Sequence, residues 1–150
     1  MKTWFAVIAV CASCLVLAAD SEKKIQKKDL PAAVQKAADE QTKGAEIKGY
    51  SKEVEKGKTF YEVETIVDAH GRDLLFDAAG KLVETEEEVA IDKVPAAARA
   101  AIEKAATGGK INKVEILTKG SAVTYEASIT GKSGKKSEVL FNADGTKGKE

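Results

Sequence analysis

The stretch Leu30-Pro31-Ala32-Ala33 recurs 64 residues later as Val94-Pro95-Ala96-Ala97. Two further blocks recur in the same order: Tyr61-Glu62-Val63 as Tyr125-Glu126-Ala127, and Phe76-Asp77-Ala78-Ala79-Gly80 as Phe141-Asn142-Ala143-Asp144-Gly145. Three blocks repeated in one order indicate an internal duplication. The sequence therefore predicts two tandem repeats, one over residues 30–89 and one over residues 90–150.

Each repeat is predicted to open with a helix, because proline suits the first helical position and needs no N–H partner there. Alternating polar and apolar residues then predict antiparallel strands, as between Thr59 and Val67. A repeat of about sixty residues is only marginally stable alone, because it buries roughly 60% of the surface that its unfolded chain exposes. The expected fold class is α+β: two tandem repeats, each one helix followed by a three- or four-stranded antiparallel meander, packed as one unit.

Charged segments at the borders of the repeats are predicted to be connections. The run Glu84-Thr85-Glu86-Glu87-Glu88 is expected to be a solvated edge and part of a linker that continues to Lys93. Residues 20–29, with four lysines, are expected to form a flexible tether.

The first nineteen residues have the pattern of a secretory signal peptide: Lys2, an apolar run from Trp4 to Ala19, then a polar switch. Cleavage between Ala19 and Asp20 is expected, and cleavage after Ala18 is the alternative. A lipoprotein modified at Cys14 and an uncleaved membrane anchor are two other interpretations, although the apolar run is shorter than the roughly twenty residues of a spanning helix. The protein is therefore expected to be exported, to the periplasm or the medium, without a transmembrane span after cleavage.

Composition argues against several kinds of chemistry. The chain balances 24 basic against 24 acidic residues, so it lacks the positive excess typical of nucleic-acid binding. Both cysteines lie in the expected signal peptide, and His70 is the only histidine. A catalytic dyad or closed zinc site is thus not expected. We predict no enzyme activity and assign no catalytic, cofactor-binding or metal-binding residue.

The repeated motifs, from Leu/Val-Pro-Ala-Ala to Phe-Asp-x-x-Gly, resemble those of the PepSY-like family, which is described as β-lactamase-inhibitor-like. The resemblance covers about residues 29–148 in two copies. It implies exported bacterial α+β domains without catalytic function, which bind or restrain other proteins through a concave sheet.

The expected function is an exported protein-binding module, an inhibitor or regulator of another envelope or secreted protein. The alternative is a structural or stress-related envelope protein without a dedicated ligand. Tyrosine is enriched in binding hot spots, so the repeated pairs are candidate partner contacts: Tyr61, Glu62, Tyr125 and Glu126. Sheet packing is the other explanation for the two tyrosines.

Overall fold

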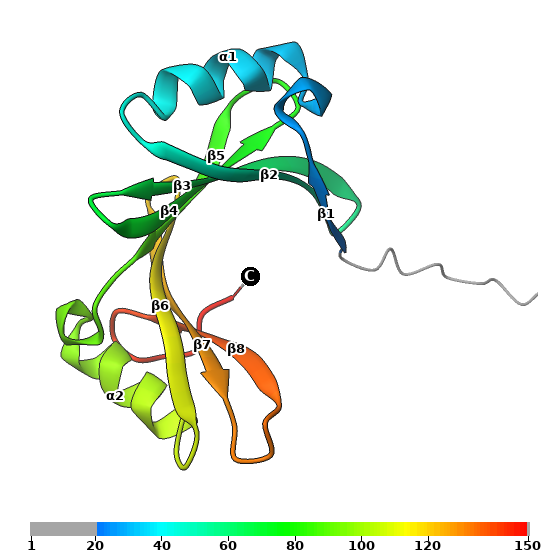
Figure 1. Ribbon diagram of the computed structural model, residues 1–150. Helices are drawn as coiled ribbons and strands as arrows, with labels where there is room; N and C mark the ends of the chain where they lie inside the picture. Colours follow the sequence, from blue (N-terminus) through cyan, green and yellow to red (C-terminus); the bar gives the residue numbers. More distant parts are fainter. Residues whose placement is uncertain (1–20, 150) are drawn as a thin grey trace, which may run out of the picture.

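The computed structural model describes residues 21–149 and contains eight strands and two α-helices (Figure 1). The elements are β1 (Ser21–Ile25), η1 (Lys27–Asp29), α1 (Ala32–Gln41), β2 (Glu46–Glu55), β3 (Lys58–Val67), β4 (His70–Asp77), β5 (Leu82–Glu88), η2 (Ile91–Lys93), α2 (Ala96–Ala105), β6 (Lys110–Lys119), β7 (Ala122–Thr130) and β8 (Lys136–Asn142). The expected signal peptide and the Ala19–Asp20 cleavage position lie outside the described residues.

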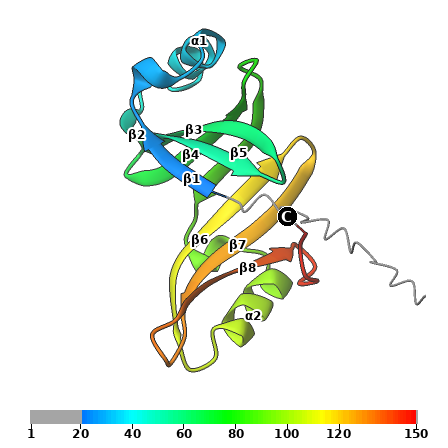
Figure 2. The same cartoon turned by 90° about the vertical axis from the view of Figure 1, so that its right-hand side faces the viewer.

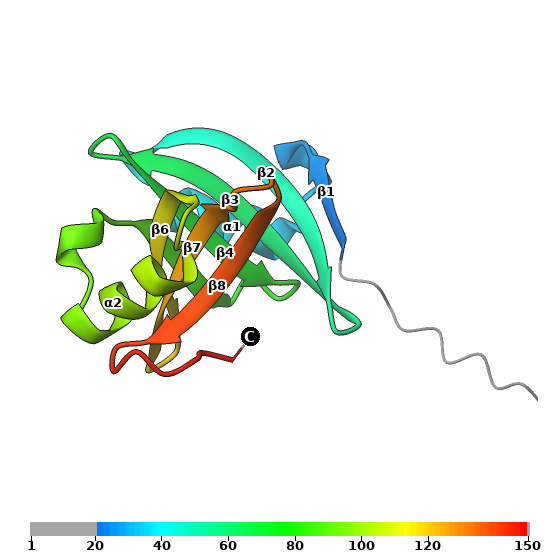
Figure 3. The ribbon, with the colours of Figure 1, turned by 90° about the horizontal axis from the view of Figure 1, so that it is seen from below.

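All eight strands form one antiparallel sheet in chain order, from β1 at one edge to β8 at the other. The sheet is strongly curved, and the chain end after β8 points into its hollow side (Figure 1). The helices lie at opposite ends of the molecule, on the outer side of the sheet (Figures 1 and 2). Seen from below, the strands of the two ends cross obliquely, as in a twisted sheet (Figure 3).

The predicted fold class, two tandem helix-plus-meander repeats, is wrong. The molecule is a single continuous eight-stranded sheet carrying two short helices. The difference arises at β5, which the sequence suggested was partly a solvated linker. Instead β5 pairs with β4 on one side and with β6 on the other, from Thr85 opposite Thr118 to Glu88 opposite Glu115. Its backbone thereby joins what would have been two separate sheet edges.

The predicted tether also differs from the structure. Residues Ser21 to Ile25 form β1, which pairs with β2 from Val54 back to Tyr50, and a short 3-10 helix follows. Ile25 packs against the buried cluster beneath α1, which explains why this segment is held on the sheet. Within residues 21–149, no helix is long and apolar enough to cross a membrane.

Each α-helix begins directly after a proline, as the sequence indicated: Pro31 precedes α1 and Pro95 precedes α2. Their buried side chains, such as Val34 and Ile102, face the outer side of the sheet. Two separate cores result. The core under α1 contains Leu30, Val34, Ala38, Val63, Leu74 and Phe76, and the core under α2 contains Val94, Ala98, Ile102, Ala106, Val114, Ala127 and Ile129.

Two glycine turns hold the helix starts against the sheet. Gly80 has φ +81°, and a Cβ there would lie 2.6 Å from the carbonyl oxygen of Ala33. Gly145, also at φ +81°, approaches the carbonyl oxygen of Ala97 in the same way, with a Cβ at 2.7 Å. Only glycine allows both the left-handed backbone and this close approach.

Candidate functional site: an acidic concave sheet face

Strand alternation sends apolar side chains to the helices and acidic side chains to the opposite, concave face. On β3, Val63 and Thr65 are buried on the helix side, while Glu62 and Glu64 point to the concave side. The same alternation places Asp73 of β4 and Glu115 of β6 on that side. Neither α1 nor α2 covers this face, and the carboxylates of neighbouring strands lie together on it (Figure 1).

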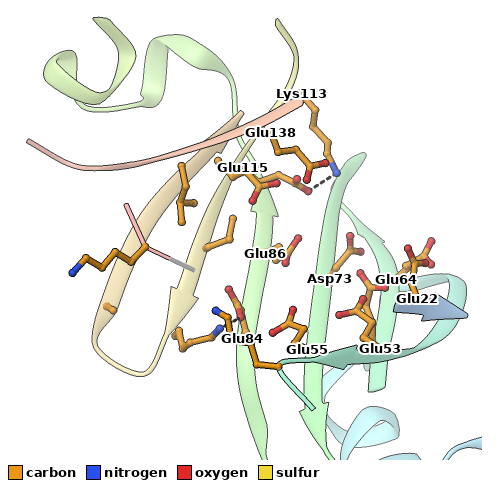
Figure 4. A pocket seen from close by; sticks show the side chains of 18 of the residues that line it. Glu22, Glu53, Glu55, Glu64, Asp73, Glu84, Glu86, Lys113, Glu115 and Glu138 are labelled. Atoms are coloured by element: carbon orange, nitrogen blue, oxygen red, sulfur yellow. Dashed lines mark ion pairs between the residues drawn. The ribbon is translucent and has the colours of Figure 1, made fainter. Parts of the chain in front are cut away.

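These side chains line a cleft of about 590 Å³ (Figure 4). Eleven carboxylates and five lysines border it: Glu22, Glu53, Glu55, Glu62, Glu64, Asp73, Glu84, Glu86, Glu115, Glu126 and Glu138, with Lys24, Lys56, Lys113, Lys119 and Lys149. Between residues 21 and 149 the chain has 22 acidic and 23 basic residues, so eleven acidic and eighteen basic residues lie elsewhere. The cleft is thus negative in a chain whose remaining surface is positive.

The strand register places like charges directly opposite one another. Asp73 lies between Glu64 on β3 and Glu86 on β5. Glu115 lies between Glu88 on β5 and Glu126 on β7. Like charges at opposed sheet positions are destabilising, and several such pairs occur on the same face.

Lysines neutralise the two most buried carboxylates. The Glu115 side chain is only 6% exposed, and its Oε1 lies 2.7 Å from Lys113 Nζ. The Glu84 side chain is 9% exposed, with its Oε2 lying 2.6 Å from Lys119 Nζ. The hydrogen bond to Glu84 raises the pKa of Lys119. At the β1 edge, Lys24 forms ion pairs with Glu22 and Glu64, and its pKa is raised chiefly by Glu64.

A second group lies toward β2, around Glu53 and Glu62. The Ser51 hydroxyl donates a hydrogen bond of 2.6 Å to Glu62 Oε2. Burial, followed by the charge of Glu62, raises the pKa of Glu53 to about 8. The Glu53 carboxyl is therefore largely protonated at neutral pH.

Asp73, Glu86 and Glu115 form the central cluster, in which carboxylate oxygens of all three lie within 4.8 Å of one another. Burial, and then Glu115, raises the pKa of Glu86 to about 8. Burial, and then Glu62, raises the pKa of Asp73 to about 6, although the Thr65 N–H donates a 3.2 Å hydrogen bond to its Oδ1. Such oxygen donors suit a hard cation, and with one oxygen from each residue they would supply three of the six to eight oxygens that calcium takes.

The candidate contacts named from the sequence fall on different faces of the sheet. Glu62 and Glu126 line the concave cleft. Tyr61 packs against the core under α1 and Tyr125 against the core under α2, so both lie on the helix side. His70 is exposed at the start of β4, away from the residues that border the cleft.

Sequence reasoning missed the central residues of the cleft, Asp73, Glu86 and Glu115. A signal was present, because Glu84, Glu86 and Glu88 occupy alternate positions of one short segment. That spacing is typical of one strand face. The run of adjacent charges suggested a linker instead.

No family model matches the chain, and no curated protein matches its sequence. Solved structures do match. A Bacteroides eggerthii protein described provisionally as periplasmic has a TM-score of 0.64 and 18% identity, over 80% of this chain and 86% of that one. A DUF2874 family protein from Bacteroides uniformis has a TM-score of 0.63 and 19% identity, over 79% and 86%.

A third match is a BLIP-like protein, named for its likeness to a β-lactamase inhibitor, from Bacteroides fragilis. Its TM-score is 0.55 at 24% identity, over 79% of this chain and 82% of that one. The chain therefore has the fold of DUF2874 family and BLIP-like proteins. At these identities the likeness concerns the fold alone.

Proposed function

We propose that this protein is exported and serves as a non-enzymatic, inhibitor-like module that binds another envelope or secreted protein on its concave sheet face. The observation that carries the proposal is the acidic cleft on the face that neither helix covers. Like charges at opposed strand positions destabilise a sheet, so stability alone does not explain this arrangement. Departures of this kind from what stabilises a fold are expected at functional sites.

The BLIP-like neighbour supports a protein partner, and the signal-peptide pattern of the first nineteen residues supports export. We assign the contact to the acidic members of the repeated Tyr-Glu pairs, Glu62 and Glu126. The neighbouring tyrosines then have a supporting role, because they pack between the sheet and the helices.

The test uses tagged protein from Asp20 to Glu150 as bait in envelope extract of its source, followed by cross-linking and mass spectrometry. The variant Glu62→Gln/Glu126→Gln alters the concave face. The matched control, Glu40→Gln/Glu103→Gln, removes the same charge from exposed positions of the helices. Circular dichroism establishes that both fold.

The expected result is a stoichiometric partner, cross-linked to β2–β7 side chains of the concave face, whose capture falls in the first variant but not in the control. Cross-links confined to α1 and α2 would contradict the proposed surface. A bait that captures no partner but forms concentration-dependent oligomers in light scattering would favour the structural envelope protein instead.

A further inference from the structure

Two of the three central carboxylates, Asp73 and Glu86, have no lysine of residues 21–149 paired with them, whereas Glu115 and Glu84 do. Lys113 and Lys119 are engaged with Glu115 and Glu84. Asp73 and Glu86 lie directly opposite each other on β4 and β5. Among the described residues, neither forms an ion pair with a lysine or an arginine. In Figure 4 both side chains project into the middle of the open face.

The ion pairs at the margins of the cleft show which kind of group the carboxylates of this face bind. At three places an ammonium group contacts a carboxylate there: Lys24 at Glu64, Lys113 at Glu115 and Lys119 at Glu84. The lysines come from β1 and β6, on either side of the central strands. Cationic side chains therefore already occupy both margins, and the unneutralised pair lies between them.

We infer that the partner presents a basic protrusion, a loop or segment bearing several Lys or Arg side chains, whose cationic ends lie against Asp73 and Glu86. This inference rests on the proposed function, since it specifies the partner of the same face. Charge complementarity is its basis: the cleft has eleven carboxylates against five lysines, while the rest of the described chain is positive. An acidic partner surface would be repelled from this face.

The geometry favours a side-chain cation over a free divalent ion. Lys113 Nζ, 2.7 Å from Glu115, already places a positive charge at the edge of the central cluster. A dication would be repelled by that ammonium and would find few oxygen ligands. A guanidinium or ammonium group needs fewer acceptors, and two opposed carboxylates supply them.

Binding would also relieve the repulsion built into the sheet. Asp73 meets Glu64 and Glu86 across the strands, and Glu86 faces the charges of Glu115 and Glu126 as well. A cation inserted between these groups changes an unfavourable arrangement into a favourable one. The free protein thus holds its carboxylates in the arrangement that a basic partner requires.

The test measures calorimetric binding of hexa-arginine and hexa-lysine to the protein from Asp20 to Glu150, at pH 8.5 in low salt. Hexaglutamate and calcium chloride serve as comparison titrants. The variant Asp73→Asn/Glu86→Gln is compared with Glu40→Gln/Glu103→Gln, which has the same net charge. The basic peptides should bind the wild type and the control alike, and bind the cleft variant at least about tenfold more weakly, a difference of about 1.4 kcal/mol.

Equal weakening in both variants would overturn the inference, because it would mean that net charge alone governs binding. Absence of peptide binding, or calcium binding that the cleft variant abolishes while peptides do not bind, would overturn it too. Cross-linking of the envelope partner distinguishes failure of this inference from failure of the proposed function. If a partner is still cross-linked to the concave face and its affinity is unchanged by Asp73→Asn/Glu86→Gln, the inference of a basic protrusion is wrong. The proposed binding function is then retained.

Discussion

Asp73 and Glu86 lie directly opposite each other on β4 and β5, and their carboxylate oxygens, with one of Glu115, lie within 4.8 Å of one another. Three acidic groups at this separation oppose the fold at high pH, because each disfavours ionisation of the others. The same carboxylates therefore connect the stability of the sheet to its proposed binding role.

The first prediction concerns Glu86→Gln and pH. In the folded protein burial raises the pKa of Glu86 to about 8, whereas in an unfolded chain it is about 4.3. Between these values the folded state binds more protons, so the contribution of Glu86 to stability falls as pH rises. Glu86→Gln should therefore raise Tm at pH 9, by about 4 °C for each kcal/mol gained, and change it little at pH 4.

Calorimetric scans of wild type, Glu86→Gln and the exposed control Glu103→Gln, each at both pH values, measure this effect. A lower Tm for Glu86→Gln at pH 9 would show that the Glu86 carboxylate is stabilising there, contrary to the repulsion described.

The second prediction concerns the ion pair between Lys119 and Glu84. The Glu84 carboxylate is nearly buried and Lys119 lies 2.6 Å away. Lys119→Met should destabilise the protein by about 1–2 kcal/mol at pH 8, less than for a wholly buried pair because the lysine is half exposed. Adding Glu84→Gln should restore most of the loss, since no isolated charge remains.

Urea unfolding of the two single variants and the double variant gives this comparison, with Lys104→Met on the surface of α2 as a control. Additive losses, without recovery in the double variant, would mean that the two side chains do not interact.

The third prediction concerns the turn after β4. Gly80→Ala introduces a Cβ 2.6 Å from the Ala33 carbonyl oxygen at a φ of +81°. Gly57→Ala provides a matched control, because Gly57 has φ +78° but, apart from its own chain neighbours, no atom lies within 4 Å of the position that an added methyl group would take. Gly57→Ala should cost about 1–2 kcal/mol from backbone conformation alone, and Gly80→Ala clearly more.

Equal unfolding free energies for the two alanine variants in urea would indicate that the turn does not press on the start of α1. The predicted difference requires the helix and the turn to be in contact.

The fourth prediction concerns protons released on binding. At pH 7, Glu86 and Glu53, with pKa values of about 8, are largely protonated, and Asp73, with a pKa of about 6, is partly so. The groups that face Glu86 are Asp73, Glu62, Glu84, Glu115 and Glu126, with Lys113 and Lys119 nearby. A bound cation favours the ionised carboxylates, so binding of hexa-arginine should release protons and strengthen from pH 6 to pH 8.5.

Calorimetry at pH 7 in buffers of different ionisation enthalpy counts the protons. Equal heats in every buffer, or tighter binding at pH 6 than at pH 8.5, would be inconsistent with contact between the peptide and this cluster. Asp73→Asn/Glu86→Gln should release fewer protons than the wild type.

The sequence predicted the positions of the helices, because proline and the apolar spacing act within a few residues of chain. It did not predict one continuous sheet. That outcome depends on β5 pairing with β6, from which it is separated by a helix, and pairing between strands so far apart in the chain leaves no local signal. A run of glutamates such as that in β5 predicts a solvated linker, because charge runs are usually exposed.

Half of the proposed contacts could be found from the sequence. Glu62 and Glu126 are candidates from sequence because they occur in a repeated motif, and both line the cleft. Asp73 and Glu115 lie in no repeated block, and only the register places them opposite Glu86 and Glu126. Curvature then brings together carboxylates that are far apart in sequence.

The central claim is that a basic partner lies on the concave face, and NMR shift mapping tests it most directly. Labelled protein from Asp20 to Glu150 is titrated with hexa-arginine at pH 8.5. We predict shifts concentrated at Asp73, Glu86 and Glu115 and their strand neighbours, with none on α1 or α2. Shifts spread over the helices, or no shifts on β4 to β6, would contradict the claim.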